Sequence, residues 1–352
     1  MIDFANTSTN PIIIAGPCSA ETREQTLETA KALSSYGVKI FRAGLWKPRT
    51  MPGTFEGVGK IGLKWLREIE DMTGMISATE IATAQHIKDA LKEKIGVFWI
   101  GARTTTSPFA VQEIARELQG REDIALLVKN PVNTDADLWI GAIERFKAAG
   151  IHNIAAVHRG FSSYEKGLFR NLPYWHIPIE VKRRLPGLTM ICDPSHIGGR
   201  KELVHHISQQ AMDMGFNGLM IESHITPDTA LSDSNQQITP DELNEILKKL
   251  VIRDYFDPSS NLKEYRREID EIDERILSLL SQRLEIARDI GRYKIEHNIP
   301  VVQHSRFERI IQNRTLQARE LGLNEDFIKS ILETIHEESV KEQVELRNKN
   351  KS

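Results

Sequence analysis

The stretch FRAGLWKPRT (41–50) places three cations directly after a hydrophobic segment. They are Arg42, Lys47 and Arg49. The glycine, tryptophan and proline among them favour a shaped loop over a solvated run of charge. Guanidinium and ammonium groups bind the oxygens of phosphates and carboxylates. The stretch therefore predicts a loop that binds anionic ligands.

A charged or metal-ligating side chain follows each of eight short apolar segments between residues 11 and 224. In chain order these side chains are Cys18, Arg42 (with Lys47 and Arg49), Glu80, Arg103, Lys129, Arg159, His196 and Glu222. The cations among them would repel one another at a single site unless anions bind there. We therefore expect more than one anionic group, from either two phosphorylated substrates or one phosphate and one carboxylate.

Other side chains of this set predict a metal site. With Asp233 from the segment ALSDS they supply a thiolate, an imidazole and two carboxylates, from Cys18, His196, Glu222 and Asp233. This mixture of sulfur, nitrogen and oxygen ligands suits Mn²⁺, Fe²⁺, Co²⁺ or Zn²⁺ better than Mg²⁺. We expect one divalent ion, with Mn²⁺ as the first choice.

The apolar segments that precede these residues are continuous rather than alternating, as in strands buried on both faces. Segments with helical periodicity lie between most of them. Eight such units in about 250 residues predict a (β/α)8 TIM barrel, with a doubly wound open sheet as the alternative. In a barrel the carboxyl ends of the strands form one face, where the predicted residues would meet. GVGKIG (57–62) matches a dinucleotide-binding pattern, but no strand directly precedes it, and we interpret it as a loop over that face.

The character of the sequence changes after Phe256, where DPSSN (257–261) is typical of a turn or linker. We therefore divide the chain into residues 1–256 and 257–352. The second part predicts three helices, 265–297, 306–321 and 326–346. An apolar stripe runs along the first of them, formed by Ile269, Ile272, Ile276, Leu279, Leu280 and Leu284. Three helices cannot easily bury so long a stripe, so we expect a homodimer through this part.

Composition excludes several classes of function. The net charge of −3 does not favour nucleic acid as a partner. The two cysteines, Cys18 and Cys192, are too few for a disulfide framework and fit a reducing cytosol. The polar start MIDFANTSTN does not resemble a signal peptide, and no apolar run approaches the length of a membrane span. A cytoplasmic protein without a membrane partner is the expectation.

Five motifs together resemble 3-deoxy-D-arabino-heptulosonate 7-phosphate (DAHP) synthase in its short bacterial form. They are GPCSAE (16–21), RAGLWKPRT (42–50), IGAR (100–103), DPSH (193–196) and IESH with ALSD (221–224 and 230–233). The resemblance covers nearly all of residues 1–250. It implies condensation of phosphoenolpyruvate with erythrose 4-phosphate, the first step of the shikimate pathway.

The resemblance also implies roles for single residues. The metal ligands would be Cys18, His196, Glu222 and Asp233. The phosphoenolpyruvate contacts would be Arg42, Lys47, Arg103, Lys129, Arg159 and His196. The erythrose 4-phosphate loop would be Lys47, Pro48, Arg49 and Thr50. Lys47 is the candidate acid for the new hydroxyl, and Glu80 is a candidate for positioning water.

A sister family makes an octulosonate 8-phosphate from arabinose 5-phosphate and resembles the same barrel. It typically carries Lys-Ala-Asn-Arg where this chain has Lys47, Pro48 and Arg49. This difference favours the four-carbon sugar as the second substrate.

YRREIDEIDERILSLLSQRLEIARDIGRYK (265–294) resembles the all-helical chorismate mutase, and the likeness extends over residues 262–343. It implies a chorismate site formed by Arg266, Arg283, Lys294, Arg306, Ser339 and Gln343. Chorismate rearranges by a pericyclic path, so the site need only hold a compact conformer and stabilise charge on the breaking ether oxygen. Lys294 and Gln343 would supply the latter. Gln303 and Phe307 depart from acidic residues found in that family.

The expected protein is a bifunctional enzyme in which prephenate exerts feedback on the barrel. Two alternatives stay open. The helical part would be only a regulatory and dimerisation module that binds chorismate or prephenate, or the whole chain would be a non-catalytic scaffold that binds phosphosugars.

Overall fold

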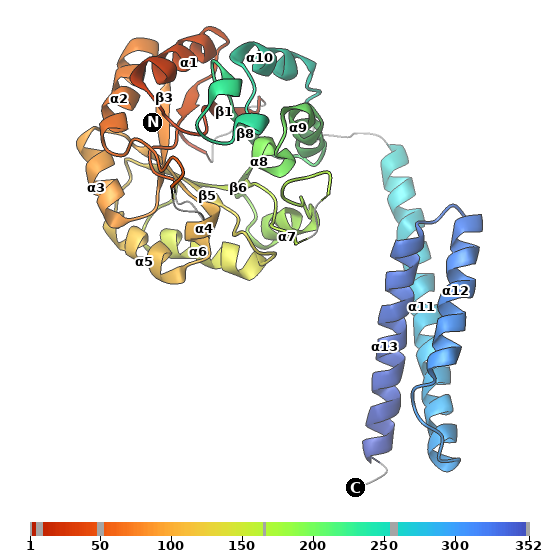
Figure 1. The fold of residues 1–352 in the computed structure, drawn as a ribbon. Coiled ribbons are helices and arrows are strands. Elements are labelled where there is room, and N and C mark those ends of the chain that lie inside the picture. Colours follow the sequence, from red (N-terminus) through yellow and green to blue (C-terminus); the bar gives the residue numbers. More distant parts are fainter. Residues whose placement is uncertain (1, 5–9, 48–52, 165–166, 254–259, 350–352) are drawn as a thin grey trace. The chain divides into compact units, whose positions relative to one another are not determined.

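The computed structural model describes residues 2–4, 10–47, 53–164, 167–253 and 260–349. The chain forms two compact units, Met1–Tyr255 and Phe256–Ser352 (Figure 1). None of the helices in the described part is long and apolar enough to cross a membrane.

The first unit is a closed barrel of eight parallel strands in sequential order, which confirms the predicted (β/α)8 fold over the open sheet. The strands are β1 (Ile12–Gly16), β2 (Ile40–Arg42), β3 (Ile76–Ile81), β4 (Val97–Ile100), β5 (Ala125–Lys129), β6 (Ile154–His158), β7 (Thr189–Cys192) and β8 (Gly218–Glu222). Pairing of β1 with β8, from Ile12 with Gly218 to Gly16 with Glu222, closes the barrel.

Helices surround the strands on the outside of the barrel (Figure 1). They are α1 (Arg23–Ser35), α2 (Ile61–Thr73), α3 (Ala84–Lys92), α5 (Pro108–Glu117), α6 (Ala136–Ala148), α7 (His176–Arg184), α9 (Val204–Asp213) and α10 (Pro240–Lys249). Two short helices, α4 (Ala102–Thr105) and α8 (Pro194–Gly198), instead follow the carboxyl ends of β4 and β7 directly. Several begin at a side-chain cap. The clearest is α10, where Thr239 and Glu242 form a reciprocal capping box.

Each strand is buried on both faces because the barrel has two apolar clusters. In β4, Val97 and Trp99 belong to the inner cluster, whereas Phe98 and Ile100 pack against the helices. This alternation explains why the strand sequences are apolar throughout. At the end of β1 the chain needs glycine, because a Cβ on Gly16 would lie 2.1 Å from the Arg42 carbonyl oxygen. That close approach brings the ends of β1 and β2 together.

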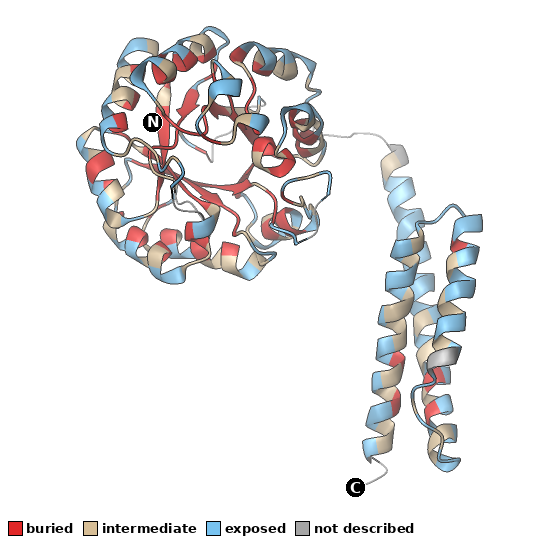
Figure 2. Cartoon of the chain, in the orientation of Figure 1, coloured by how far each residue is buried: buried red, intermediate tan, exposed pale blue. Residues whose placement is uncertain are grey.

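The second unit consists of α11 (Ser260–Glu296), α12 (His304–Glu320) and α13 (Glu325–Lys349), and α13 packs against both other helices. These are the three predicted helices, with the first beginning five positions earlier than expected. Ala287 and Ala318 are the buried apolar side chains among its described residues, and most of its surface is exposed (Figure 2). This unit alone therefore has little hydrophobic core.

An apolar row remains exposed along α11. Its side chains are between 45% and 62% exposed and belong to Tyr265, Ile269, Ile272, Ile276, Leu279, Ile286, Ile290 and Tyr293. They recur at alternating intervals of three and four, with one skipped position, which is the heptad pattern of a helix that pairs with another helix. Leu280 and Leu284 of the predicted stripe are instead partly buried.

Candidate active sites

The carboxyl ends of the barrel strands surround a pocket of about 440 Å³. The predicted residues that line it are Lys47, Glu80, Arg103, Lys129, Arg159, His196 and Asp233. Three further predicted residues are almost wholly buried: Cys18, Arg42 and Glu222. Pro48, Arg49 and Thr50 lie outside the described residues, so the contacts expected of them stay predictions.

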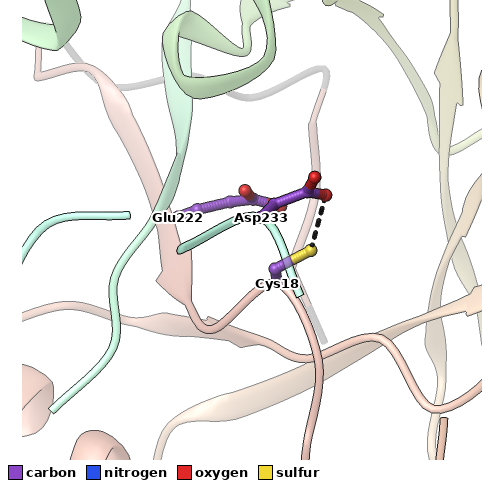
Figure 3. Close-up of side chains that lie close together, drawn as sticks. All are labelled: Cys18, Glu222 and Asp233. Carbon is purple, nitrogen blue, oxygen red and sulfur yellow. Dashed lines mark hydrogen bonds between the residues drawn. The ribbon is translucent and has the colours of Figure 1, made fainter. Parts of the chain in front are cut away.

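Three of the four predicted metal ligands form a tight cluster (Figure 3). Ligand atoms of Cys18, Glu222 and Asp233 all lie within 4.8 Å of one another. Cys18 follows β1, Glu222 ends β8 and Asp233 lies in the loop after β8, so closure of the barrel brings them together. Asp233 has a φ of 49°, an uncommon value for a residue other than glycine. A thiol and two carboxylates in this arrangement fit a divalent transition-metal ion.

His196 lies beside this cluster rather than within it. Its Nε2 is 3.7 Å from Glu222 Oε1, and among the described residues the set within 4.8 Å does not include it. Its Nδ1 is 3.0 Å from Asp193 Oδ1, and a carboxylate partner makes Nδ1 the donor. Burial lowers the pKa of His196, although Asp193 opposes the shift. The ring therefore turns an unprotonated Nε2 toward Glu222, the form in which histidine binds metals.

The Cys18 thiol is buried between groups of opposite charge. Lys47 Nζ donates to Cys18 Sγ at 2.9 Å, and Sγ donates to Asp233 Oδ2 at 3.2 Å. Burial and the Glu222 carboxylate raise the pKa of the thiol to about 12, although Lys47 opposes the shift. Burial alone would lower the pKa of Lys47, but the negative groups around it raise it. Lys47 therefore contacts the candidate metal cluster directly and remains protonated.

Two residues that sequence reasoning missed, Arg170 and Gln236, link the two carboxylates of the cluster. Arg170 Nη1 donates to Asp233 Oδ1 at 2.9 Å and to Gln236 Oε1 at 2.6 Å. Gln236 Nε2 donates in turn to Glu222 Oε2 at 2.6 Å. Arg170 lies in the long connection between β6 and α7, away from any strand end. The rule that placed the other residues at strand ends could not find it.

Two other cations that line the pocket, Lys129 and Arg159, have an acidic and a neutral hydrogen-bond partner respectively. Lys129 Nζ donates to Asp193 Oδ2 at 2.7 Å, and Arg159 Nη1 donates to Asn171 Oδ1 at 2.8 Å. Asn171, also missed by sequence reasoning, donates to the His196 carbonyl at 2.6 Å. Burial lowers the pKa of Lys129 and lowers that of Arg159 to about 10. An anionic ligand would offset this cost of burying positive charge.

Arg42 keeps unused hydrogen-bond donors in the interior. Its Nη2 donates to Glu222 Oε1 at 3.1 Å, whereas Nε and Nη1 are buried without a hydrogen-bond partner within the described residues. Buried donors without partners are rare, because each costs free energy. Acceptor oxygens of a ligand would satisfy these two groups.

The helical unit has a separate pocket of about 450 Å³. The predicted residues that line it are Arg283, Lys294, Arg306, Ser339 and Gln343. Arg283 Nη1 donates to Ser339 Oγ at 2.6 Å, and Lys294 Nζ donates to Gln343 Oε1 at 3.2 Å. Contacts between α11 and α13 thus hold the polar groups in pairs, in a pocket with no acidic lining residue among those described.

The remaining predicted chorismate residue and the two positions that depart from the resembling family differ in their relation to this pocket. Arg266 is exposed and lies outside the pocket, roughly 25 Å along α11 from Arg283 at about 1.5 Å per residue. Gln303 and Phe307, the two positions at which we expect a departure from the chorismate mutase pattern, both line the pocket. Phe307 stacks on His336, with 3.9 Å between ring centroids. His336 also lines the pocket, and nothing in its sequence context singled it out.

Comparison with known proteins separates the same two units. Residues 4–254 match the family described as DAHP synthetase I, and residues 265–344 match chorismate mutase type II. A phospho-2-dehydro-3-deoxyheptonate aldolase of Thermotoga maritima is 35% identical over 238 residues, which cover 68% of each chain. A 2-dehydro-3-deoxyphosphooctonate aldolase of Geobacter sulfurreducens is 26% identical and aligns with 68% of this chain and 90% of its own.

Solved structures agree with the sequence comparisons. The crystal structure of phospho-2-dehydro-3-deoxyheptonate aldolase (DAHP synthase) from Thermotoga maritima superposes with a TM-score of 0.63 at 31% identity, covering 70% of this chain and 71% of that one. A truncated form of the synthase from the same organism gives a TM-score of 0.58 at 30% identity, covering 67% and 84%. The chain therefore belongs to the DAHP synthetase I family, with a chorismate mutase type II domain following the synthase barrel.

Proposed function

We propose that the chain carries two activities of aromatic biosynthesis. The barrel condenses phosphoenolpyruvate with erythrose 4-phosphate to DAHP and phosphate, and the helical unit rearranges chorismate to prephenate. One observation carries this proposal. Each unit has its own cation-lined pocket, and each matches a different enzyme family. A scaffold that only binds phosphosugars would need neither the ligand cluster nor the second pocket.

In the barrel, the cations would divide two anionic substrates between them. Arg42, Arg103, Lys129 and Arg159, with His196, would bind the phosphate and carboxylate of phosphoenolpyruvate. Lys47 would contact both substrates, and Pro48, Arg49 and Thr50 would complete the site for erythrose 4-phosphate. Support comes from two donors of buried Arg42 that have no hydrogen-bond partner among the described residues, and from the burial of Lys129 and Arg159, which an anion would offset.

The ligand cluster would hold one divalent ion, for which we propose Mn²⁺ first and Fe²⁺, Co²⁺ or Zn²⁺ as alternatives. Cys18, Glu222 and Asp233 would bind it, and His196 would join them through Nε2. Such an ion supplies Lewis acidity toward the aldehyde of erythrose 4-phosphate. The mixed thiol, imidazole and carboxylate set fits these borderline ions.

The protein's own groups would handle the proton transfers. C3 of phosphoenolpyruvate attacks the aldehyde carbon, and Lys47 Nζ donates a proton to the oxygen that becomes the new hydroxyl. Water then adds at C2, and phosphate leaves with cleavage of the C–O bond. Glu80 would position that water, because its carboxylate lines the pocket at the end of β3. The higher identity to the heptonate enzyme than to the octonate enzyme favours the four-carbon sugar.

In the helical unit, catalysis would need only groups that bind chorismate and groups that stabilise the charge of the transition state. Arg283 and Arg306 would hold the two carboxylates of chorismate, and Ser339 would orient Arg283 through their hydrogen bond. Lys294 and Gln343 would stabilise the negative charge that develops on the ether oxygen. Support comes from the hydrogen bond between these two side chains, both of which line the pocket.

The helical units of two copies would pair through the exposed row of α11. A heptad row that is half exposed in one chain is suited to burial against a second copy. Arg266 is too far from the pocket of its own chain, so we propose that it completes the pocket of the partner copy. Sedimentation of wild type and of Leu279→Lys tests this pairing. Pairing through α11 predicts a dimer that the charged variant dissociates, and an unaltered dimer would contradict it.

We further propose a domain boundary between residues 256 and 257 and inhibition of DAHP formation by prephenate. Prephenate can act only if it binds two states of the chain with different affinity. Truncation near residue 257 should then remove the inhibition. Equal sensitivity of the truncated and full-length proteins would contradict the coupling. If the full chain binds chorismate without consuming it, the regulatory-module alternative replaces the mutase.

A further inference from the structure

Trp99 lies at the meeting point of three groups of the barrel site. It belongs to β4 and to the inner apolar cluster, with only 1% of its surface exposed. The guanidinium carbon of Arg42 is 4.8 Å from the centroid of its ring, and Lys129 Nζ is 5.9 Å from that centroid. Its Nε1 donates to Glu80 Oε2 at 3.1 Å. One buried side chain thus contacts two of the proposed phosphoenolpyruvate-binding cations and the proposed water-positioning carboxylate.

The contact between Trp99 and Arg42 offsets part of the free-energy cost of burying the Arg42 charge. Arg42 is 1% exposed, and its Nη2 is engaged with Glu222 and, at 3.5 Å, with the Cys18 carbonyl. A second carboxylate would stabilise the guanidinium further but would also occupy Nε and Nη1. The negative face of an indole stabilises a cation without accepting its N–H groups in ordinary hydrogen bonds. The tryptophan therefore offsets part of the burial cost while Nε and Nη1 stay available to a ligand.

The same ring serves Lys129 in a weaker way. Lys129 Nζ already donates to Asp193 at 2.7 Å, and at 5.9 Å it lies near the limit at which a ring face attracts a cation. Attraction to the same ring offsets part of the repulsion between the like charges of Arg42 and Lys129.

The N–H group at the edge of the indole holds the Glu80 carboxylate in place. Nε1–H fixes Oε2, and Oε1 lies so close to Gly101 that a Cβ there would be only 2.1 Å away. Each oxygen of the carboxylate is therefore constrained, one by a donor and one by the backbone. Among natural side chains only tryptophan combines a strong cation-binding face with an edge N–H donor that has no acceptor capacity.

We propose that Trp99 is a positioning residue of the synthase site, whose ring face keeps Arg42 ready to bind phosphoenolpyruvate and whose N–H holds Glu80. This inference rests on the proposed synthase function of the barrel. The ring face should affect the affinity for phosphoenolpyruvate and the N–H should affect kcat, so the two contributions can be measured separately.

Two variants separate the face from the edge in the full-length protein with Mn²⁺ present. Trp99→Phe keeps a ring face but removes the N–H, and Trp99→Leu removes both. Phosphoenolpyruvate binding is measured by titration calorimetry, and kcat and KM by phosphate release. We expect Trp99→Leu to bind phosphoenolpyruvate about tenfold more weakly, the equivalent of about 1.4 kcal/mol. Trp99→Phe should stay within about threefold of wild-type affinity but lose about tenfold in kcat, because Glu80 loses its donor.

Trp139→Phe is the matched control. Trp139 is also fully buried and donates from Nε1, but its partner, at 3.1 Å, is the Val128 backbone carbonyl rather than a carboxylate of the site. It should leave phosphoenolpyruvate affinity unchanged. Wild-type affinity in Trp99→Leu, or equal losses of affinity in Trp99→Phe and Trp99→Leu, would overturn the inference. If Trp99→Leu does not fold, wild-type kcat in Trp99→Phe would overturn it alone.

A further variant distinguishes failure of this inference from failure of the proposed function. Arg42→Met removes the guanidinium that the ring is said to hold. If Arg42→Met binds phosphoenolpyruvate like wild type, the barrel site itself is misassigned. If Arg42→Met loses affinity while Trp99→Leu does not, the site stands and the role of Trp99 is wrong.

Discussion

At the scale of residues, Cys18 connects Lys47 to the candidate metal ligands of the barrel site. Its Sγ accepts from Lys47 and donates to Asp233, so the candidate proton donor and the candidate metal ligands share one atom. Arg170 and Gln236 then fix the remaining carboxylate oxygens. A change at any of these residues should therefore alter metal binding and synthase activity together.

Cys18→Ala tests the role of the thiol. We expect loss of DAHP formation and at least a tenfold weaker Mn²⁺ affinity, because the soft ligand disappears from the set. Chorismate consumption should persist, since the second pocket has no residue in common with the first. Calorimetric metal titration and both activity assays check the variant. Retained DAHP formation together with unchanged metal affinity would refute the ligand assignment.

A substitution at Gly101 tests whether synthase activity depends on the position of the Glu80 carboxylate. A Cβ at this position would lie 2.1 Å from Glu80 Oε1, so Gly101→Ala must displace the carboxylate. We expect a fall in synthase kcat of about tenfold or more, because small misplacements in an active site are costly. Gly141→Ala on α6 is the control, since a Cβ there meets nothing within 4 Å. Equal kcat values for both variants would argue against a role for Glu80.

At the scale of elements, the sequence could predict those site residues that lie at the ends of strands. A continuous apolar strand followed by a polar residue places that residue at the mouth, and this rule located Glu80, Lys129 and Glu222. It could not locate Arg170 or Asn171, because a long connection has no periodicity that fixes where its side chains point. Trp99 does lie on a strand, but the sequence did not single it out as a site residue, because an apolar strand residue is normally assigned to the core.

The helical elements show a similar division. The number, order and approximate limits of α11, α12 and α13 followed from apolar periodicity, whereas α4 and α8 in the barrel were too short to give a pattern. Periodicity also predicted an unburied stripe on α11, but the pairing of Phe307 with His336 depends on the contact between α12 and α13. Contacts between separate helices are not encoded in the spacing along either one.

Strand β6 carries a buried histidine whose titration should affect stability. Burial lowers the pKa of His158 to about 3, with Arg159 adding to the shift and the Pro173 carbonyl and Asp193 opposing it. The folded state thus resists protonation, and the unfolded state takes up the proton below about pH 6.5. The contribution of His158 is complete above that pH and is lost as the pH falls toward 3. The loss amounts to about 1.4 kcal/mol per pH unit.

His158→Leu removes this dependence. Its free energy of unfolding should fall less steeply between pH 6.5 and 4.5 than that of wild type, whatever its absolute stability. Denaturant unfolding followed by tryptophan fluorescence reports on the barrel, because all five tryptophans precede residue 176. Parallel pH profiles for the two proteins would show that His158 does not titrate as its burial implies.

The contact between α11 and α13 gives a prediction for the second pocket. Arg283→Ala should lower chorismate turnover by about tenfold or more, because a charge-assisted contact typically contributes about 1.5–3 kcal/mol. The α11 residue Arg292, which pairs with Asp289 on the surface, provides the control Arg292→Ala. Synthase activity should be unchanged in both variants. Normal chorismate turnover in Arg283→Ala would favour a pocket that only binds.

At the scale of the whole molecule, the two units differ in how complete they are alone. The barrel closes on itself and contains both of its apolar clusters and its candidate metal ligands. The helical unit leaves the row on α11 exposed and one predicted chorismate residue, Arg266, outside its pocket. We therefore expect mutase activity to depend on pairing of two copies and to fall in Leu279→Lys.

The central claim is that one chain carries a metal-dependent synthase site and a metal-independent mutase site. The most direct test follows phosphate release from phosphoenolpyruvate and erythrose 4-phosphate, and loss of chorismate, in one preparation of full-length protein before and after treatment with a chelator. The account predicts both activities at the start, loss of phosphate release after chelation with recovery on adding Mn²⁺, and chorismate consumption that does not change. Phosphate release that survives complete removal of metal, or chorismate loss that disappears with it, would contradict the account.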